Sequence, residues 1–214
     1  MYTALVLRSR PSGESNSEVT MLTAEEGILK ATVYGGAKSK LRSHSAPYNS
    51  GLVWVYRDPA KNYAKISDFD VKSWRPGLRE LYERTMAASG VAETILSSHG
   101  GGGEWNSALE LTVQTLDALE NAPEELCERL LVHFLWRWAG FLGIQPDLDD
   151  HEDTDEIKNP INPGSRRWLS AVALLEPSNL HRYSMDNKSL GEAKALTTAI
   201  ITSAIGRRLA SWDW

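Results

Sequence analysis

The chain has one cysteine, Cys127, among its 214 residues, and this excludes an intrachain disulfide. Its first ten residues, MYTALVLRSR, lack the basic leader, the apolar stretch and the small-residue cleavage site of a secretory signal. No apolar run approaches the roughly 20 residues that are needed to span a bilayer. We therefore expect a cytoplasmic protein that has no membrane partner.

Signatures of nucleotide binding and of catalysis are also missing. The four consecutive glycines at 100–103 follow a predicted helix rather than a strand, and no Lys-Ser or Lys-Thr pair follows them. They therefore predict a loop and not a phosphate-binding turn. No Ser/His/Asp or Cys/His arrangement is recognisable, so the sequence gives no indication of an enzyme.

The net charge of -5 is unevenly distributed along the chain. Residues 1–80 contain 12 Lys and Arg against 8 Asp and Glu, a net charge of +4, whereas the other 134 residues contain 11 against 20, a net charge of -9. The first part is therefore suited to a polyanion, and the second part to different partners.

The first part of the chain has the pattern of a small barrel. About five short strands, separated by Gly, Pro and acidic turns, predict a five-stranded OB-fold barrel over residues 1–78. The period changes at Pro76, after which helical spacing predicts an all-α helical domain over residues 79–214. The predicted fold class is therefore α+β.

Local details follow from the same patterns. Strict alternation in the last strand predicts that Lys65, Ser67 and Phe69 share one face, with Ile66 on the other. Pro76 is predicted to open the first long helix. Gly143 is predicted to cap a later helix, and a serine precedes each of the last two helices.

Basic residues alternate in the segment GGAKSKLRSH, residues 35–44. An extended segment would place them on one face, and a loop would still cluster them. With cations and a tyrosine of neighbouring strands they form the predicted nucleic-acid site, which consists of Lys38, Lys40, Arg42, Arg8, Arg10, Lys30 and Tyr34. His44 continues the basic row, and Tyr48 is a second candidate for base stacking. The simpler alternatives are a solvated loop and tyrosines that pack in the core.

Two further features each have a functional and a simpler interpretation. The acidic segment PDLDDHEDTDEI, residues 146–157, has hard oxygen ligands but not the glycine or the spacing of a calcium loop. We favour an acidic surface loop over a catalytic metal site. Trp136 and Arg137 are interpreted first as the edge of a helical core, and a groove for a partner's peptide is the alternative.

The stretch LVLRSRPSGESNSEVTMLTAEEGILKATVYGGAKSK resembles the N-terminal barrel of the RecO family of bacterial recombination mediators. GFLGIQPDLDD is similar to the Leu-Gly-x-x-Pro-x-Leu element of that family, and IGRRLASW resembles its closing stretch. The resemblance spans nearly the whole chain and depends on the order of several elements rather than on one signature.

The resemblance implies a non-catalytic DNA repair protein of the RecF pathway, associated with the bacterial nucleoid. Such a protein binds single- and double-stranded DNA, anneals complementary strands, and with RecR helps to load RecA onto DNA coated by single-strand-binding protein (SSB). The C-terminal tail of SSB is expected on the helical domain, with Trp136 and Arg137 as candidates. The alternative is an adaptor that docks RecR and SSB and has little DNA affinity of its own.

The family's four-cysteine zinc site is not matched. His151 stands at the first cysteine position, Thr154 stands at the next, and no cysteine follows. Because Cys127 alone cannot supply tetrahedral thiolate ligation, we expect no structural zinc and no other cofactor.

Overall fold

The computed structural model describes residues 1–35, 39–61, 63–148 and 161–212. The chain forms two compact units, and each unit is made of two separate stretches of the sequence. The barrel unit consists of Met1–Pro76 and His99–Val113, and the helical unit consists of Gly77–Ser98 and Gln114–Trp214. The predicted α+β fold, with an N-terminal five-stranded barrel followed by helices, is confirmed.

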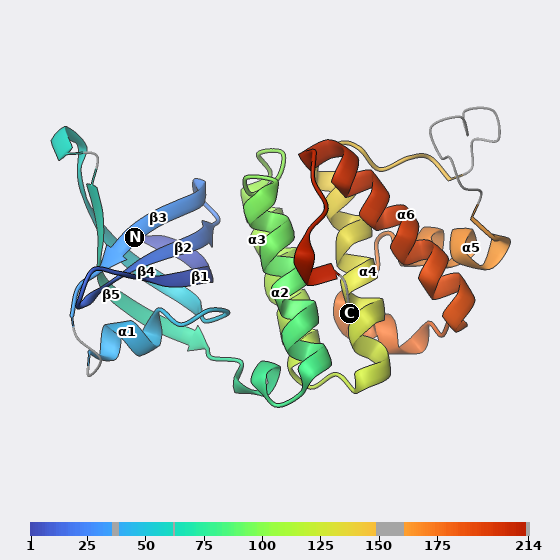
Figure 1. Cartoon of the computed structure of the whole chain (residues 1–214), viewed down its shortest axis with the longest axis horizontal. Coiled ribbons are helices and arrows are strands. Elements are labelled where there is room, and N and C mark those ends of the chain that lie inside the picture. The colour runs from blue at the N-terminus through green and yellow to red at the C-terminus, as the bar shows by residue number, and fades with distance from the viewer. Residues whose placement is uncertain (36–38, 62, 149–160, 213–214) are drawn as a thin grey trace. The chain divides into compact units, whose positions relative to one another are not determined.

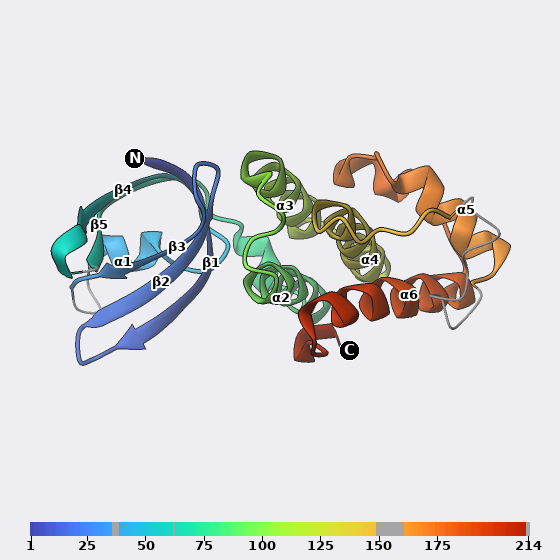
Figure 2. The same ribbon diagram turned by 90° about the horizontal axis from the view of Figure 1, so that it is seen from above.

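Five strands close into a barrel in the order β1-β2-β3-β5-β4 (Figures 1 and 2). They are β1 Tyr2–Ser12, β2 Asn16–Thr23, β3 Gly27–Val33, β4 Ser50–Asp58 and β5 Tyr63–Ser73. The short helix α1, Lys40–His44, follows β3, and a 3-10 turn, η1, Pro59–Lys61, joins β4 to β5. All neighbouring strands are antiparallel except β3 and β5. Closure protects the strand edges of the described barrel from unintended pairing.

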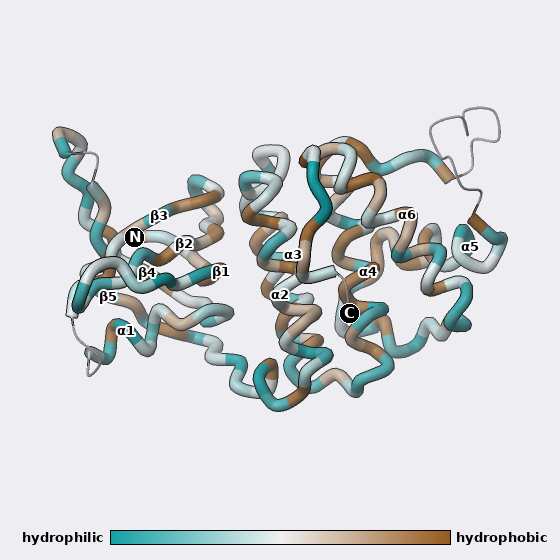
Figure 3. Tube along the Cα trace, in the orientation of Figure 1, coloured by the Kyte–Doolittle hydropathy of each residue, from teal (hydrophilic) through white to brown (hydrophobic). Residues whose placement is uncertain are grey.

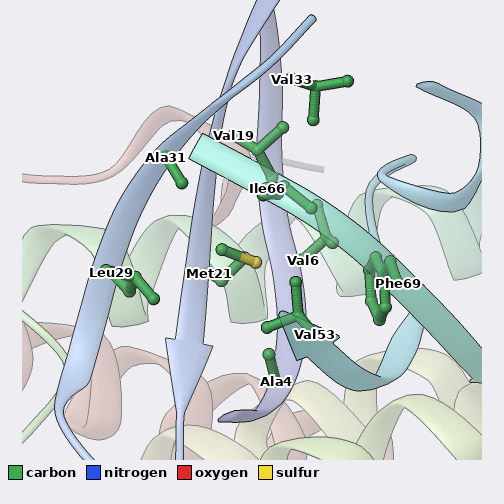
Figure 4. Close-up of a cluster of buried hydrophobic side chains, with 10 residues drawn as sticks. All are labelled: Ala4, Val6, Val19, Met21, Leu29, Ala31, Val33, Val53, Ile66 and Phe69. Carbon is green, nitrogen blue, oxygen red and sulfur yellow. The ribbon is translucent and has the colours of Figure 1, made fainter. Parts of the chain in front are cut away.

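Alternate residues of each strand fill the barrel (Figure 4). The buried cluster consists of Ala4, Val6, Val19, Met21, Leu29, Ala31, Val33, Val53, Ile66 and Phe69. Most of these side chains are aliphatic and half of them are β-branched, a composition that suits the narrow interior of a small barrel. The residues between them point outward, so the register of the strands determines which side chains meet on the outer surface.

The prediction that Phe69 and Lys65 share a face is wrong, because β5 contains a bulge. Trp54 of β4 is paired with Asp68, but the next residue, Val55, is paired with Ile66, so Ser67 is the extra residue. The Ser67 hydroxyl donates to the carbonyl oxygen of Trp54 at 3.1 Å. The bulge lets both Ile66 and Phe69 point into the core, which strict alternation does not allow.

Residues 99–113 complete the barrel unit. Gly27, in the β2–β3 turn at φ 70°, lies against the indole ring of Trp105, and a Cβ added to this glycine would be 2.7 Å from Nε1 of the ring. A Cβ on Gly100 would lie 3.0 Å from Ile28. Leu22, which is paired with Ile28 on the outer side of the sheet, is fully buried. One part of the outer surface is therefore covered rather than solvated.

The helical unit is built around α4. The helices are α2 Tyr82–Ser97, α3 Trp105–Glu120, which runs across the boundary between the units, α4 Glu124–Phe141, α5 Pro163–Val172 and α6 Asn187–Ile205. Three 3-10 turns accompany them: η2 Pro76–Arg79, η3 Pro177–Arg182 and η4 Ala210–Trp212. α4 packs against α2 and α6. Hydrophobic and hydrophilic residues alternate along these helices (Figure 3), as expected for helices with one buried face.

Some predicted helix termini are corrected. Pro76 opens the 3-10 turn η2, and the α-helix starts only at Tyr82. The last two helices are capped not by serines but by Asn162 and Asp186, whose side chains accept from the backbone N–H groups three residues on. The prediction for Gly143 is confirmed, because it follows the last residues of α4 at φ 68°. No helix in the described part of the chain is long and apolar enough to cross a membrane.

Candidate nucleic-acid interface

The strand pairings place one side chain from every strand in a row around the outside of the barrel. In this outer row Arg10 of β1 is opposite Glu18 of β2, and Glu18 is opposite Thr32 of β3. Thr32 is paired with Lys65 of β5, which is opposite Tyr56 of β4. All of these residues except the half-buried Thr32 are exposed. The row therefore combines two cations, one carboxylate and one aromatic ring on solvent-facing positions.

A second row lies beside it on three strands. Arg8 of β1 is paired with Thr20 of β2, which is paired with Lys30 of β3. Val6 of β1 points into the core, and strict alternation would turn Arg8 inward as well. The register shift between Val6 and Arg8 prevents this and turns both Arg8 and Arg10 outward. The structure thus places Arg8, Arg10 and Lys30, which the sequence assigns to two strands, on one outer surface.

We call Arg8, Arg10, Lys30 and Lys65 the cationic face. Among the described residues, none of the four forms an ion pair with a carboxylate. Three other cations of the barrel are paired: Arg57 with Glu26, Lys61 with Asp58 at 3.7 Å, and Lys72 with Asp70 at 2.6 Å. Glu18 is the one carboxylate within the two rows. The cationic face therefore has uncompensated positive charge in an acidic protein.

Tyr34 lies at the end of this face. Its side chain is 45% exposed, and the centre of its ring is 5.9 Å from Nζ of Lys65, which is within range of a cation–π interaction. Its ring is also 6.2 Å from the ring of Tyr63. Burial, followed by the interaction with the Tyr34 hydroxyl, raises the pKa of Tyr63 to about 12. Tyr63 is therefore a neutral phenol at physiological pH.

The basic segment does not form the predicted row. Residues 40–44 form helix α1 and not an extended strand, so side chains two apart point to different sides. Lys40 is exposed and Arg42 is half-buried. Leu41 packs against the barrel core, and Nδ1 of His44 is hydrogen-bonded to the carbonyl oxygen of Phe69 at 2.7 Å. Lys38 lies outside the described residues.

Lys65 and Tyr56 were missed as site residues, although both lie in predicted strands. Their proximity to Arg10 and Thr32 depends on the pairing of β3 with β5, which joins residues 32 and 65. Local periodicity contains no information about such a pairing. The predicted five-stranded barrel could have indicated this pairing, because a barrel closes only when a late strand pairs with an earlier one.

Trp136 and Arg137 lie at the centre of the helical unit. Trp136 is 2% exposed, and its indole N–H has no acceptor among the described residues. Arg137 donates from Nη1 to the carbonyl oxygen of Leu175 at 3.1 Å. His133 is within hydrogen-bonding distance of the same oxygen, at 3.0 Å. Burial, and then the Arg137 charge, lower the pKa of His133 to about 4, so the imidazole is neutral at physiological pH.

Among the described residues, no three His, Cys, Asp or Glu side chains are placed to hold a metal ion. Cys127 is fully buried, and burial raises the pKa of its thiol to about 11. His151, Thr154 and most of the acidic segment lie outside the described residues. The expectation that zinc is absent therefore stays a prediction.

Two family models match the chain. The model described as Recombination protein O N terminal matches residues 1–74, and the model described as Recombination protein O C terminal matches residues 79–213. A DNA repair protein RecO from Gloeobacter violaceus is 25% identical over 148 residues, which are 68% of this chain and 56% of the relative. One from Acaryochloris marina is 27% identical over 175 residues, 80% of this chain and 59% of the relative. The chain thus spans little more than half the length of these curated relatives.

Proposed function

This chain belongs to the RecO family, and from this membership we propose that it acts in DNA repair and recombination as a non-catalytic protein that binds single- and double-stranded DNA. The observation that carries the proposal is the cationic face: Arg8 and Arg10 on β1, Lys30 on β3 and Lys65 on β5 have no carboxylate partners among the described residues. Phosphate groups would supply the missing negative charge.

The cationic face suits a phosphate backbone rather than a particular sequence. Arg8 and Arg10 are two positions apart on one strand, so these two charges follow the pleat at a spacing of about 6.7 Å. Such contacts hold the backbone and carry no information on base identity. The closed barrel fixes the backbone at these positions, so binding needs to order only the long cationic side chains.

Family membership also motivates a proposal about finer activities. We propose that the protein anneals complementary strands and, with RecR, helps to load RecA onto SSB-coated single strands. The helical unit would take the protein contacts, including the SSB tail. Trp136 is buried, so a peptide at this place would meet the half-buried Arg137 first.

An adaptor with little DNA affinity is the second candidate, and one observation favours it. On the outer surface of β4, Trp54 is 37% exposed and is opposite the exposed Asp68. Asp70, two positions further along β5, is also exposed. The carboxylates would repel phosphates. Together with the neighbouring aromatic side chain they suit a basic protein surface.

The test is the anisotropy of a labelled single-stranded oligonucleotide at low and moderate salt. We compare the wild type with the triple variant Arg8→Ala/Arg10→Ala/Lys30→Ala, and with Lys61→Ala/Lys72→Ala as a control that removes paired cations of the same barrel. Circular dichroism checks that each variant is folded. The proposal expects salt-sensitive binding that the triple variant largely loses and the control keeps.

Two other results would contradict this assignment. No binding by the wild type at low salt would favour the adaptor, because cations that contact DNA act most strongly there. Equal binding by the wild type and a folded triple variant would exclude the cationic face as the DNA surface.

A further inference from the structure

Lys65 has an exposed tyrosine on each of two sides. Tyr56 is directly opposite it on β4, and the centre of the Tyr34 ring is 5.9 Å from its ammonium group. Tyr56 is 60% exposed and Tyr34 is 45% exposed. Two large rings thus face solvent around one cation of the cationic face, at the place where β3, β5 and β4 meet.

The two rings are held in different ways. Tyr34 directly follows β3 and is in contact with Tyr63 as well as with Lys65. The backbone of Tyr56 is fixed by strand pairing, but its side chain makes no hydrogen bond and no ring contact within the described part of the chain. Neither ring belongs to the hydrophobic core of the barrel. Core packing therefore does not account for these two tyrosines.

We propose that Tyr34 and Tyr56, on either side of Lys65, form a stacking site for unpaired nucleobases. This inference rests on the proposed DNA binding and adds the class of ligand that the site selects. Lys65 would hold a phosphate while the neighbouring bases lie on the two rings, an arrangement that tolerates any base. In a duplex the faces of the bases are already stacked on each other, so the site favours single strands over double strands.

Charge limits the extent of this site along β4. Trp54 is two residues before Tyr56 and points to the same outer side, but it is opposite Asp68 rather than a cation. The phosphate that accompanies a base stacked on Trp54 would approach this carboxylate. The stacking site therefore ends at Tyr56, and Trp54 is not part of it.

An abasic oligonucleotide separates stacking from charge, because it keeps the phosphates and lacks the bases. The dissociation constants of a normal and an abasic single strand of equal length are measured for the wild type, Tyr34→Ala, Tyr56→Ala and the corresponding phenylalanine variants. Tyr82→Ala serves as a control, since this tyrosine is 63% exposed and belongs to the helical unit. Thermal unfolding checks that each variant is stable.

We expect the wild type to prefer the normal strand over the abasic one. Each alanine variant should bind the normal strand about tenfold more weakly, while its affinity for the abasic strand and its salt dependence stay unchanged. The phenylalanine variants and Tyr82→Ala should behave as the wild type does. Lys65→Ala should weaken binding to both strands and reduce the salt slope by about 0.7.

Alanine variants that keep the full preference for the normal strand would overturn the stacking site and leave the proposed DNA binding intact. Equal binding of the two strands by the wild type would overturn the stacking site in the same way. A wild type that binds neither strand at low salt would overturn both proposals, so the two kinds of failure are distinguishable.

Discussion

Glu18 is the one carboxylate in the two rows on the outside of the barrel, and it lies between Arg10 and Thr32. We expect Glu18→Gln to bind single-stranded DNA about fivefold more tightly, because removing one negative charge near a phosphate removes roughly 1 kcal/mol of repulsion. Glu14→Gln is the matched control, since Glu14 is also exposed but lies in the turn before β2. Anisotropy titrations at low salt measure both, and an affinity unchanged by Glu18→Gln would contradict the proposed contact of DNA phosphates with the cationic face beside Glu18.

His133 makes the stability of the helical unit depend on pH. Its pKa is lowered to about 4 in the folded protein, so between about pH 6.5 and pH 4 the unfolded chain binds a proton that the folded chain does not. Stability is therefore lost as the pH falls through this window. We expect His133 to contribute a loss of about 2 kcal/mol between pH 7 and pH 5.

The contribution of His133 is measured by comparing urea unfolding of the wild type and His133→Gln at the two pH values. Glutamine can still donate to the carbonyl oxygens of Val172 and Leu175, which His133 contacts at 3.1 and 3.0 Å, but it does not titrate. The wild type should lose about 2 kcal/mol more than the variant on acidification. Equal losses in the two proteins would show that His133 titrates normally.

Single residues divide into those that the sequence could identify and those that it could not. Arg10 and Lys30 were identified as candidates because each is a cation in a predicted strand. Lys65 was missed because its closeness to Thr32 depends on the barrel closing through β3 and β5. The alternating cations Lys40 and Arg42 share a face only in an extended segment, but the same pattern also fits a short helix. Five residues contain too little periodicity to separate the two structures.

The β2–β3 turn depends on a glycine for two reasons. Gly27 has φ 70°, and a Cβ there would meet the Trp105 ring at 2.7 Å. Gly13, in the β1–β2 turn, has φ 72° but open space around it. We expect Gly13→Ala to cost about 1 kcal/mol of unfolding free energy from backbone strain alone, and Gly27→Ala to cost more than twice as much.

Urea unfolding of the two glycine variants measures the free energies, and their difference isolates the contact between the turn and Trp105. Adding Trp105→Ala removes the ring that the new Cβ would meet. The cost of Gly27→Ala should then fall to that of Gly13→Ala. Equal costs of the two single variants would show that residues 99–113 do not pack on the turn.

Strands and helices were predictable as far as their patterns were local. β2 and β3 follow from two apolar runs around a Glu-Glu-Gly turn, and α4 follows from its helical spacing and its glycine end. The bulge at Ser67 of β5 and the bulge between Val6 and Arg8 of β1 were not predictable, because an extra residue leaves the composition of the strand unchanged. These bulges decide which side chains face outward, so the site was less predictable than the fold.

At the level of the whole protein, a net charge of -5 accompanies a local positive surface on the barrel. If each of the four cations of the cationic face neutralises one phosphate, the log–log salt slope for a single strand is about -2.8. Raising the salt from 50 to 200 mM should then lower the affinity roughly 50-fold. Anisotropy titrations across this range test it, and a slope near zero would point to binding without phosphate contacts.

Residues 99–113 return to the barrel unit after the chain has already formed α2. A gene fragment that ends at residue 76 would encode all five strands but not Trp105, which lies against the β2–β3 turn. Shuffling of coding segments therefore cannot transfer this barrel intact in one uninterrupted piece that lacks α2. A segment that encodes the complete barrel unit would also encode α2, which belongs to the helical unit.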